Sequence, residues 1–383
     1  MKNQYFKYIG VYVFSYFSIG VLFPLLGQYL NQIGYSGTQI GTITASATGI
    51  GILSSPFWGS IYERKNNNIK LLSFLYIAAA LLVSSLSFIN NYWIFLIVYT
   101  MAFFFESPIR PLNDAMTINS GQGFGKIRKW GSIGFGAGVF LAGLIATQLG
   151  LVSIFVTYGI TILTSMGFVF SIGKSDDELK YFEKRKEKMA AGSMKSLLSN
   201  KKYLSIIACA FFINGTIWAH NTYFGFIYVE GGGTLAGIGV ALLLMVFSEF
   251  PVMAFSDKIT LALSVEKLIL IAMVLSTGRF LWYGTGPDHI FLTATFFLQG
   301  LVNGLTLISM MKYVVKTVDP KSINSAVTLY TAVSSNASAI FCLFIGGVLM
   351  DNFGAASVYT FFGMMNLVGI AVYLVSGMYK EHP

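Results

Sequence analysis

The chain has 383 residues, of which 55% are hydrophobic and 11% charged, and its mean hydropathy is +0.68. A soluble domain carries about 25% charged residues, so this composition excludes a soluble globular protein and indicates a membrane protein. The net charge of +9 would suit a nucleic-acid partner, but the placement of the basic residues along the chain has to decide that point.

Twelve apolar stretches follow one another, each near the length of about 20 residues that crosses a bilayer as a helix. They cover roughly residues 6–33, 38–60, 69–88, 91–115, 127–149, 151–172, 202–228, 233–255, 264–284, 288–315, 321–349 and 353–376. Some boundaries are soft, and a count of eleven stays open. The expected fold is an all-α membrane protein with twelve transmembrane helices.

Basic residues mark one side of this predicted protein. Of the 25 Lys and Arg residues, all except Arg110 and Arg279 fall at cytoplasmic ends if both termini are cytoplasmic. Since Lys and Arg favour cytoplasmic loops, we expect a multi-pass protein of the cell membrane with both termini in the cytoplasm. The positive charge is then a consequence of topology, and no nucleic-acid partner is expected.

The only long polar segment, residues 174–201, divides the chain in the middle. It mixes basic and acidic residues, including EKRKEK at 183–188. A contact with acidic lipid stays open, but the mixed charge favours a solvated cytoplasmic linker. We therefore expect one six-helix bundle at 1–173 and a second at 202–383.

The two halves resemble each other at corresponding places. Residues 143–150, GLIATQLG, match residues 347–354, GVLMDNFG, and each is followed by a similar apolar segment. A proline also precedes an acid–base pair in both halves, at Pro56 and at Pro251. Such duplication of a six-helix unit is typical of secondary transporters.

Residues 106–138, ESPIRPLNDAMTINSGQGFGKIRKWGSIGFGAG, place charged groups at membrane depth. Glu106, Arg110 and Asp114 are four residues apart, so on a helix they share one side. A charge there costs about 3 kcal/mol even on a lenient scale, so such groups pair or line a water-filled path. Mutual neutralisation and a functional role both stay open for Glu106 and Arg110. The glycines of GSIGFGAG predict a helix-packing face rather than a phosphate loop.

Two further polar residues lie within spans of the second half. Glu249 has no charged neighbour within a helical turn, which favours a proton or substrate role over a structural pair with a distant arginine. His220 lies between Trp218 and Tyr223, where a proton role and a hydrogen-bonded packing role are equally open.

The sequence contains few features of an enzyme active site. No nucleophile–base pair or metal-ligand spacing is present, so we expect no catalytic residue, no metal and no cofactor. Cys209 and Cys342 lie in apolar runs and are interpreted as small packing residues. A polytopic membrane enzyme or sensor is the remote alternative.

The loop after the second apolar stretch reads Gly59-SIY-Glu63-Arg64-KNNN. It resembles the signature loop of the major facilitator superfamily, with Glu63 where Asp is usual and Asn66 where a second Gly is usual. The resemblance implies two pseudo-symmetric six-helix bundles around a central cavity. It also implies a conformational latch formed by Gly59, Glu63 and Arg64.

Other segments narrow the resemblance to one branch of that superfamily. PLNDA at 111–115 and FGKIRKWGSIGF at 124–135 resemble the branch that contains lactose permease, the nucleoside–proton symporters and the phenylpropionate permease-like proteins. AHNTYFGFIY at 219–228 and SEFPV at 248–252 are similar to the phenylpropionate-type members.

The resemblance also implies roles for single residues. Arg128 matches the helix-five arginine that binds sugar in lactose permease, and Asp114 lies near the place of its helix-four carboxylate partner. Glu249 matches the helix-eight glutamate that binds sugar and takes part in coupling. Arg279 matches the helix-nine arginine near the proton site.

The proton-coupling pair of helix ten is absent. The histidine and glutamate expected there fall near Gln299 and Val302, which cannot titrate. Proton coupling therefore uses other groups or does not occur.

The expected function is secondary active transport of a small organic solute, an aromatic acid, a nucleoside or a sugar, by alternating access. The protein is expected to act as a monomer in the lipid bilayer, with the proton gradient as its energy source. Proton-coupled efflux of drugs or metabolites on the same fold is the alternative. The expected substrate-binding residues are Arg128, Asp114, Arg110, Trp218, Tyr223 and Glu249, and the expected proton-coupling residues are Glu249, His220 and Arg279.

Overall fold

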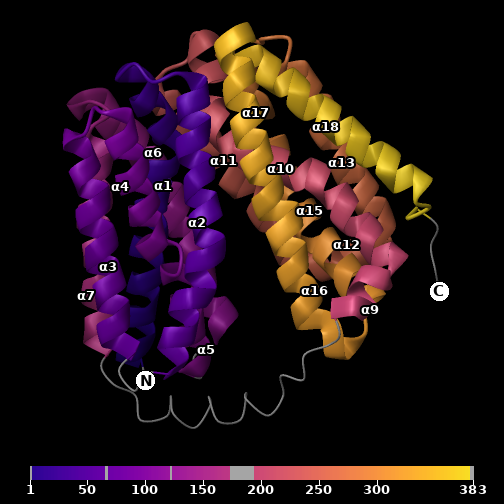
Figure 1. The fold of residues 1–383 in the computed structure, drawn as a ribbon, viewed down its shortest axis with the longest axis horizontal. Coiled ribbons are helices and arrows are strands. Elements are labelled where there is room, and N and C mark those ends of the chain that lie inside the picture. The colour runs from indigo at the N-terminus through magenta and orange to yellow at the C-terminus, as the bar shows by residue number, and fades with distance from the viewer. Residues whose placement is uncertain (1, 65–67, 121–122, 173–193, 380–383) are drawn as a thin grey trace. The chain divides into compact units, whose positions relative to one another are not determined.

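The computed structural model describes the whole chain except residues 1, 65–67, 121–122, 173–193 and 380–383 (Figure 1). All regular elements in the described residues are helices. They form two compact units, one from Met1–Tyr35 and Ser46–Met189 and the other from Ser36–Ala45 and Ala190–Pro383. Most of the predicted linker at 174–201 lies outside the described residues.

The helices of the first half form a bundle in which most members run side by side (Figure 1). They are α1 (Lys2–Gln32), α2 (Gly37–Arg64), α3 (Asn68–Ser85), η1 (Leu86–Phe88), α4 (Tyr92–Glu106), α5 (Ile109–Asn119), α6 (Phe124–Leu149) and α7 (Ser153–Ile172).

The second half contains more short helices, because several of its long segments are interrupted. Its helices are α9 (Met194–Ser199), α10 (Lys201–Glu230), α11 (Leu235–Ala254), α12 (Ser256–Ala262), α13 (Val265–Tyr283), α14 (His289–Thr295), α15 (Phe297–Thr317), η2 (Pro320–Ser322), α16 (Ile323–Tyr330), η3 (Thr331–Ala337), α17 (Ser338–Phe353) and α18 (Ala355–Val375).

The described chain holds the twelve long segments that the sequence predicts. Ten of them are long and apolar enough to cross a membrane, counting α4 with α5, α14 with α15, and α16 with α17 as continuous segments. The other two, α2 and α13, have comparable lengths of 28 and 19 residues but carry more polar side chains. The predicted class, an all-α membrane protein, is confirmed.

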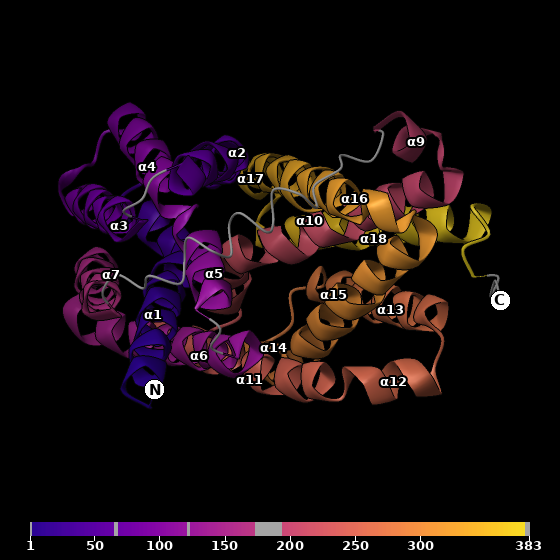
Figure 2. The same ribbon diagram turned by 90° about the horizontal axis from the view of Figure 1, so that it is seen from below.

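Helix α1 packs against α6 and α7 in the first unit (Figure 2). At Gly134 and Gly138 of α6, an added Cβ would collide with the backbone of Val13 and Phe17. Only glycine permits this close approach, so the predicted helix-packing face is confirmed. The same contact holds the N-terminal part of α6, which carries Arg128, beside α1.

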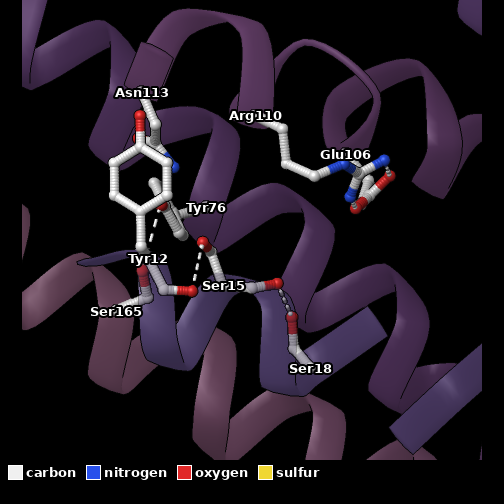
Figure 3. Close-up of polar contacts among 8 residues, drawn as sticks. All are labelled: Tyr12, Ser15, Ser18, Tyr76, Glu106, Arg110, Asn113 and Ser165. Carbon is white, nitrogen blue, oxygen red and sulfur yellow. Dashed lines mark hydrogen bonds and ion pairs between the residues drawn. The ribbon is translucent and has the colours of Figure 1, made fainter. Parts of the chain in front are cut away.

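A buried chain of hydrogen bonds links four helices of the first unit (Figure 3). Asn113 Nδ2 donates to the Tyr76 hydroxyl at 2.8 Å, and this hydroxyl lies 3.1 Å from Ser165 Oγ. Ser165 Oγ in turn donates to the Val11 carbonyl at 2.9 Å. Such bonds contribute about 0.6 kcal/mol each in membrane proteins, so they specify the position of α5 more than they stabilise the bundle.

In the second unit, α10, α13 and α18 are joined by a similar link. Thr216 Oγ1 donates to Asn366 Oδ1 at 3.0 Å, and Asn366 Nδ2 donates to Ser276 Oγ at 2.7 Å. An apolar core that includes Ile206 and Met273 surrounds α10. This packing places His220 and the C-terminal part of α13 in the interior of the unit.

The first turns of α2, residues 36–45, are part of the second unit. Asp351 of α17 accepts hydrogen bonds from the Gly37 N–H, from the Thr38 N–H at 2.8 Å and from Thr38 Oγ1 at 2.6 Å. The first N–H groups of a helix have no partner within it and carry partial positive charge, so this carboxylate acts as a cap from another helix.

Candidate functional site

The charged stretch of the first unit is divided between two helices. Glu106 is the last residue of α4, the chain turns at Ser107 and Pro108, and Arg110 lies in the first turn of α5. Arg110 donates to both carboxylate oxygens of Glu106 (Figure 3). Glu106 is 1% exposed, whereas Arg110 is partly exposed. The two charges therefore neutralise each other, which is one of the possibilities that the sequence left open.

Asp114 makes different contacts from the other two charges of the stretch. Its Oδ1 accepts a hydrogen bond from the Tyr12 hydroxyl at 2.6 Å and lies 3.5 Å from Arg128 Nε. The side chains of Asp114 and Arg128 are 30% and 37% exposed. Helices α1, α5 and α6 thus bring together a carboxylate and a guanidinium group that both remain accessible.

Two tyrosine rings of α1 border this pair. The Arg128 guanidinium carbon lies 4.5 Å from the centre of the Tyr16 ring and 6.0 Å from that of Tyr12. The two rings are nearly parallel, with an interplanar angle of 6°. A hydrogen-bond acceptor, a fork of donors and aromatic faces therefore lie within reach of one small molecule.

The carboxylate of Glu249 in the second unit lies beside a carboxamide. Glu249 is partly buried on α11, next to the Asn303 side chain of α15. Asn303 Oδ1 accepts from Gln299 Nε2 at 3.0 Å. At Gly300 an added Cβ would meet the Met245 carbonyl and the Glu249 backbone nitrogen, so α15 approaches α11 closely here. Glu249 forms no ion pair with any residue that the structure describes.

His220 is fully buried, and its Nδ1 lies 2.9 Å from the Tyr359 hydroxyl. Aromatic rings surround the imidazole on several sides, with centroids 5.3–6.2 Å away. They are Phe224, Phe280, Tyr283, Phe296 and Tyr359.

Arg279 is only 3% exposed and stacks on the rings of Phe280 and Tyr283, at 4.4 and 5.3 Å. Its guanidinium forms no ion pair and no hydrogen bond with the residues that the structure describes. A desolvated cation–π contact contributes about 2 kcal/mol, whereas an uncompensated buried charge costs several. The aromatic contacts alone therefore do not balance this charge.

The remaining predicted residues have varied surroundings. Trp218 is 59% exposed on α10, whereas Tyr223 is fully buried and donates to the Leu343 carbonyl. Because its hydroxyl already donates to a backbone carbonyl, Tyr223 is not part of the proposed site. The predicted latch includes Gly59, where an added Cβ would meet open space. The side chains of Glu63 and Arg64 lie outside the described residues.

Sequence reasoning did not identify Tyr12 or Tyr16 as site residues, and for Asn303 it favoured helix–helix hydrogen bonding over a place in a cavity wall. Tyr12 and Tyr16 stand four positions apart in the first apolar stretch, so they share one side of α1. That spacing was the available signal, but aromatic residues are common in membrane helices and the signal is weak alone. For Asn303 the signal was a polar side chain within an apolar span.

Two all-helical units with charged side chains in their interiors define a polytopic membrane transporter. Residues 5–361 match the sequence profile of the MFS_1 like family, so the chain belongs to this family of the major facilitator superfamily. It is therefore a secondary transporter and not an enzyme.

The chain is similar to proteins that carry different solutes. It is 29% identical over 369 residues to the maltose permease of Geobacillus stearothermophilus, covering 95% of this chain and 92% of that protein. It is 26% identical over 296 residues to the probable 3-phenylpropionic acid transporter of Escherichia coli strain K12, covering 73% and 74%. The crystal structure of the nucleoside transporter NupG has a TM-score of 0.81 at 14% identity, covering 99% of this chain and 100% of that one, and shows the shared fold.

Proposed function

We propose that this transporter carries a neutral, polyhydroxylated solute of the sugar class, bound in the first unit by Asp114, Arg128 and Tyr16. The observation that carries the proposal is the charge balance of this region. Arg128 lies against Asp114, and Arg110 is paired with Glu106. An anionic solute would have to displace a carboxylate from its arginine, whereas a neutral one would not.

A sugar matches the groups that this site offers. One hydroxyl can donate to Asp114 while a neighbouring hydroxyl accepts from Arg128, and hydrogen bonds to charged groups contribute about 1.5–3 kcal/mol each. The apolar face of a sugar ring can pack on Tyr16, which lies beside the guanidinium. Similarity to a maltose permease over 95% of the chain supports the same class of substrate.

For the driving force we propose proton symport with Glu249 as the proton-carrying group. Glu106, Asp114 and Glu266 each have a cationic partner within 4 Å, whereas Glu249 lies beside a carboxamide. A carboxylate without a cation can take up and release a proton without breaking an ion pair. His220 is not proposed as the proton carrier, because the positive charge of Arg279 beside it opposes protonation of the imidazole.

We further propose uptake across the cell membrane, with both termini in the cytoplasm and alternating access of one site to the two sides. The distribution of Lys and Arg supports this orientation. Flux measured in right-side-out and inverted vesicles distinguishes uptake from drug or metabolite efflux.

The experiment that tests the substrate class is counterflow in proteoliposomes across a panel of sugars, nucleosides and aromatic carboxylates. We expect saturable exchange of a mono- or disaccharide that is lost in Asp114→Asn. Asp288→Asn is the matched control, because Asp288 is exposed and caps α14 far along the chain from this site. Exchange of aromatic carboxylates alone, or unchanged sugar exchange in Asp114→Asn, would contradict the proposal.

A further inference from the structure

The second unit contains a buried cation whose charge nothing in the described chain compensates. Arg279 of α13 is 3% exposed, and its Nε, Nη1 and Nη2 atoms have no hydrogen-bond partner. The Tyr283 hydroxyl lies close to the guanidinium but not in hydrogen-bonding geometry, and a neutral phenol would not balance the charge. A membrane protein keeps such a group when it has a partner, so the partner has to be identified.

The carboxylates of the second unit that the structure describes within or beside its long helices have other neighbours. Glu266 is paired with Lys316 at 3.1 Å. Asp351 caps α2. Glu249 is on α11 and lies beside Asn303 of α15. Helix α11 packs on α15 rather than on α13. Glu230, Asp288 and Asp319 are exposed at or beside helix ends, so none of the carboxylates that the structure describes in the second unit supplies the counter-charge for Arg279.

A second buried side chain near the guanidinium has one polar atom without a partner in the described chain. His220 is 0% exposed, and its ring is near enough to Arg279 for the two to interact electrostatically. When the Tyr359 hydroxyl donates to Nδ1, the imidazole proton resides on Nε2, which has no partner either. Two helices, α10 and α13, thus contribute buried donors without acceptors.

We propose that Arg279 and His220 Nε2 bind a small monovalent anion, either a halide or the carboxylate of a small acid. One guanidinium charge matches one negative charge. Phe280 and Tyr283 beside it provide a weakly polar surrounding that suits an anion with a low cost of dehydration. This site lies within the second unit, so it is distinct from the sugar site proposed in the first.

Binding to the folded state raises the melting temperature, Tm, with ligand concentration, which gives a direct test. The Tm of the purified full-length protein is measured in detergent, without sugar, while chloride replaces the bulky sulfonate MES at constant ionic strength. We expect a saturable rise of Tm with chloride in the wild type and in Lys201→Gln, which removes an exposed cation at the start of α10. We expect no such rise in Arg279→Gln.

A second variant keeps the proposal testable if Arg279→Gln fails to fold. His220→Leu removes only the neutral donor and should raise the half-saturating chloride concentration by about tenfold. A parallel titration with acetate distinguishes a halide site from a carboxylate site. A rise of Tm with acetate but not with chloride assigns the site to carboxylates. A Tm that depends on ionic strength only, or a wild-type chloride response in either the Arg279→Gln or the His220→Leu variant, would overturn the proposal. Neither result would bear on sugar exchange at Asp114.

Discussion

Tyr12 and Tyr16 contribute to the proposed sugar site in different ways, and substitutions can separate them. Tyr12→Phe keeps the ring but loses the 2.6 Å hydrogen bond to Asp114, so we expect the apparent affinity for sugar to fall by about 10-fold or more. Tyr16→Leu keeps an apolar side chain but loses the aromatic face beside Arg128, so we expect a fall of about 2- to 10-fold. Initial rates of sugar uptake at varied concentration measure both effects. Wild-type affinity for sugar in both variants would show that α1 does not contribute to the sugar site.

Glu249 is the residue on which proton coupling depends in our proposal. Glu249→Gln retains the size of the side chain and its neighbour Asn303 but cannot exchange a proton. We expect proton-driven accumulation of sugar to be lost while sugar–sugar exchange continues. Accumulation and exchange are measured in the same proteoliposomes, so a folding defect would remove both. Accumulation that survives the substitution would contradict the assignment.

At the scale of helices, the contact between α1 and α6 depends on glycine. In Gly134→Ala the new methyl group meets the Val13 carbonyl, a backbone atom that cannot rotate away, so we expect a loss of about 1–3 kcal/mol in stability. Gly167→Ala is the matched control, because open space surrounds that position of α7 and alanine favours the helix. Thermal unfolding in detergent measures both variants. Equal Tm values for the two variants would show that the α1–α6 contact accommodates a methyl group at position 134.

The cap of α2 can be tested in the same way. Asp351→Ala removes the acceptor for the first N–H groups of α2, so we expect a loss of about 0.5–1 kcal/mol in stability, in the lower half of the range for caps because Asp351 is exposed. Asn352→Ala is a neighbouring control, since Asn352 bonds to the Val348 carbonyl of its own helix. A Tm for Asp351→Ala equal to that of the control would show that Ser36 and Gln39, which bond to each other's backbone N–H, suffice as the cap.

An interruption between two helices explains why the sequence prediction for the charged stretch at 106–114 was incomplete. Spacing alone placed Glu106, Arg110 and Asp114 on one continuous helix, but the chain turns at Ser107 and Pro108, between α4 and α5. The Glu106–Arg110 pair keeps its four-residue spacing across the turn, whereas Asp114 faces Tyr12 and Arg128. Local spacing predicts local pairs, but it cannot predict which distant helix a side chain meets.

For the whole molecule, hydropathy and charge placement were sufficient for the fold. Twelve spans follow from composition along the chain, because a membrane segment must be apolar over its full length. The family resemblance rests on short motifs such as the loop that begins at Gly59. The same reasoning could not foresee that Arg279 has no partner or that residues 36–45 join the second unit. Both depend on contacts between residues far apart in sequence, and neither leaves a local pattern.

The charge carried in each transport cycle tests sugar–proton symport most directly. A neutral sugar that enters with a proton moves one positive charge, whereas an aromatic carboxylate that enters with one proton moves none. In proteoliposomes we therefore predict that a sugar from the panel causes both proton uptake and an inward-positive current, and that Asp114→Asn and Glu249→Gln remove both signals. Proton uptake caused by an aromatic carboxylate, without current and without any response to sugars or nucleosides, would contradict the proposed substrate class and its site.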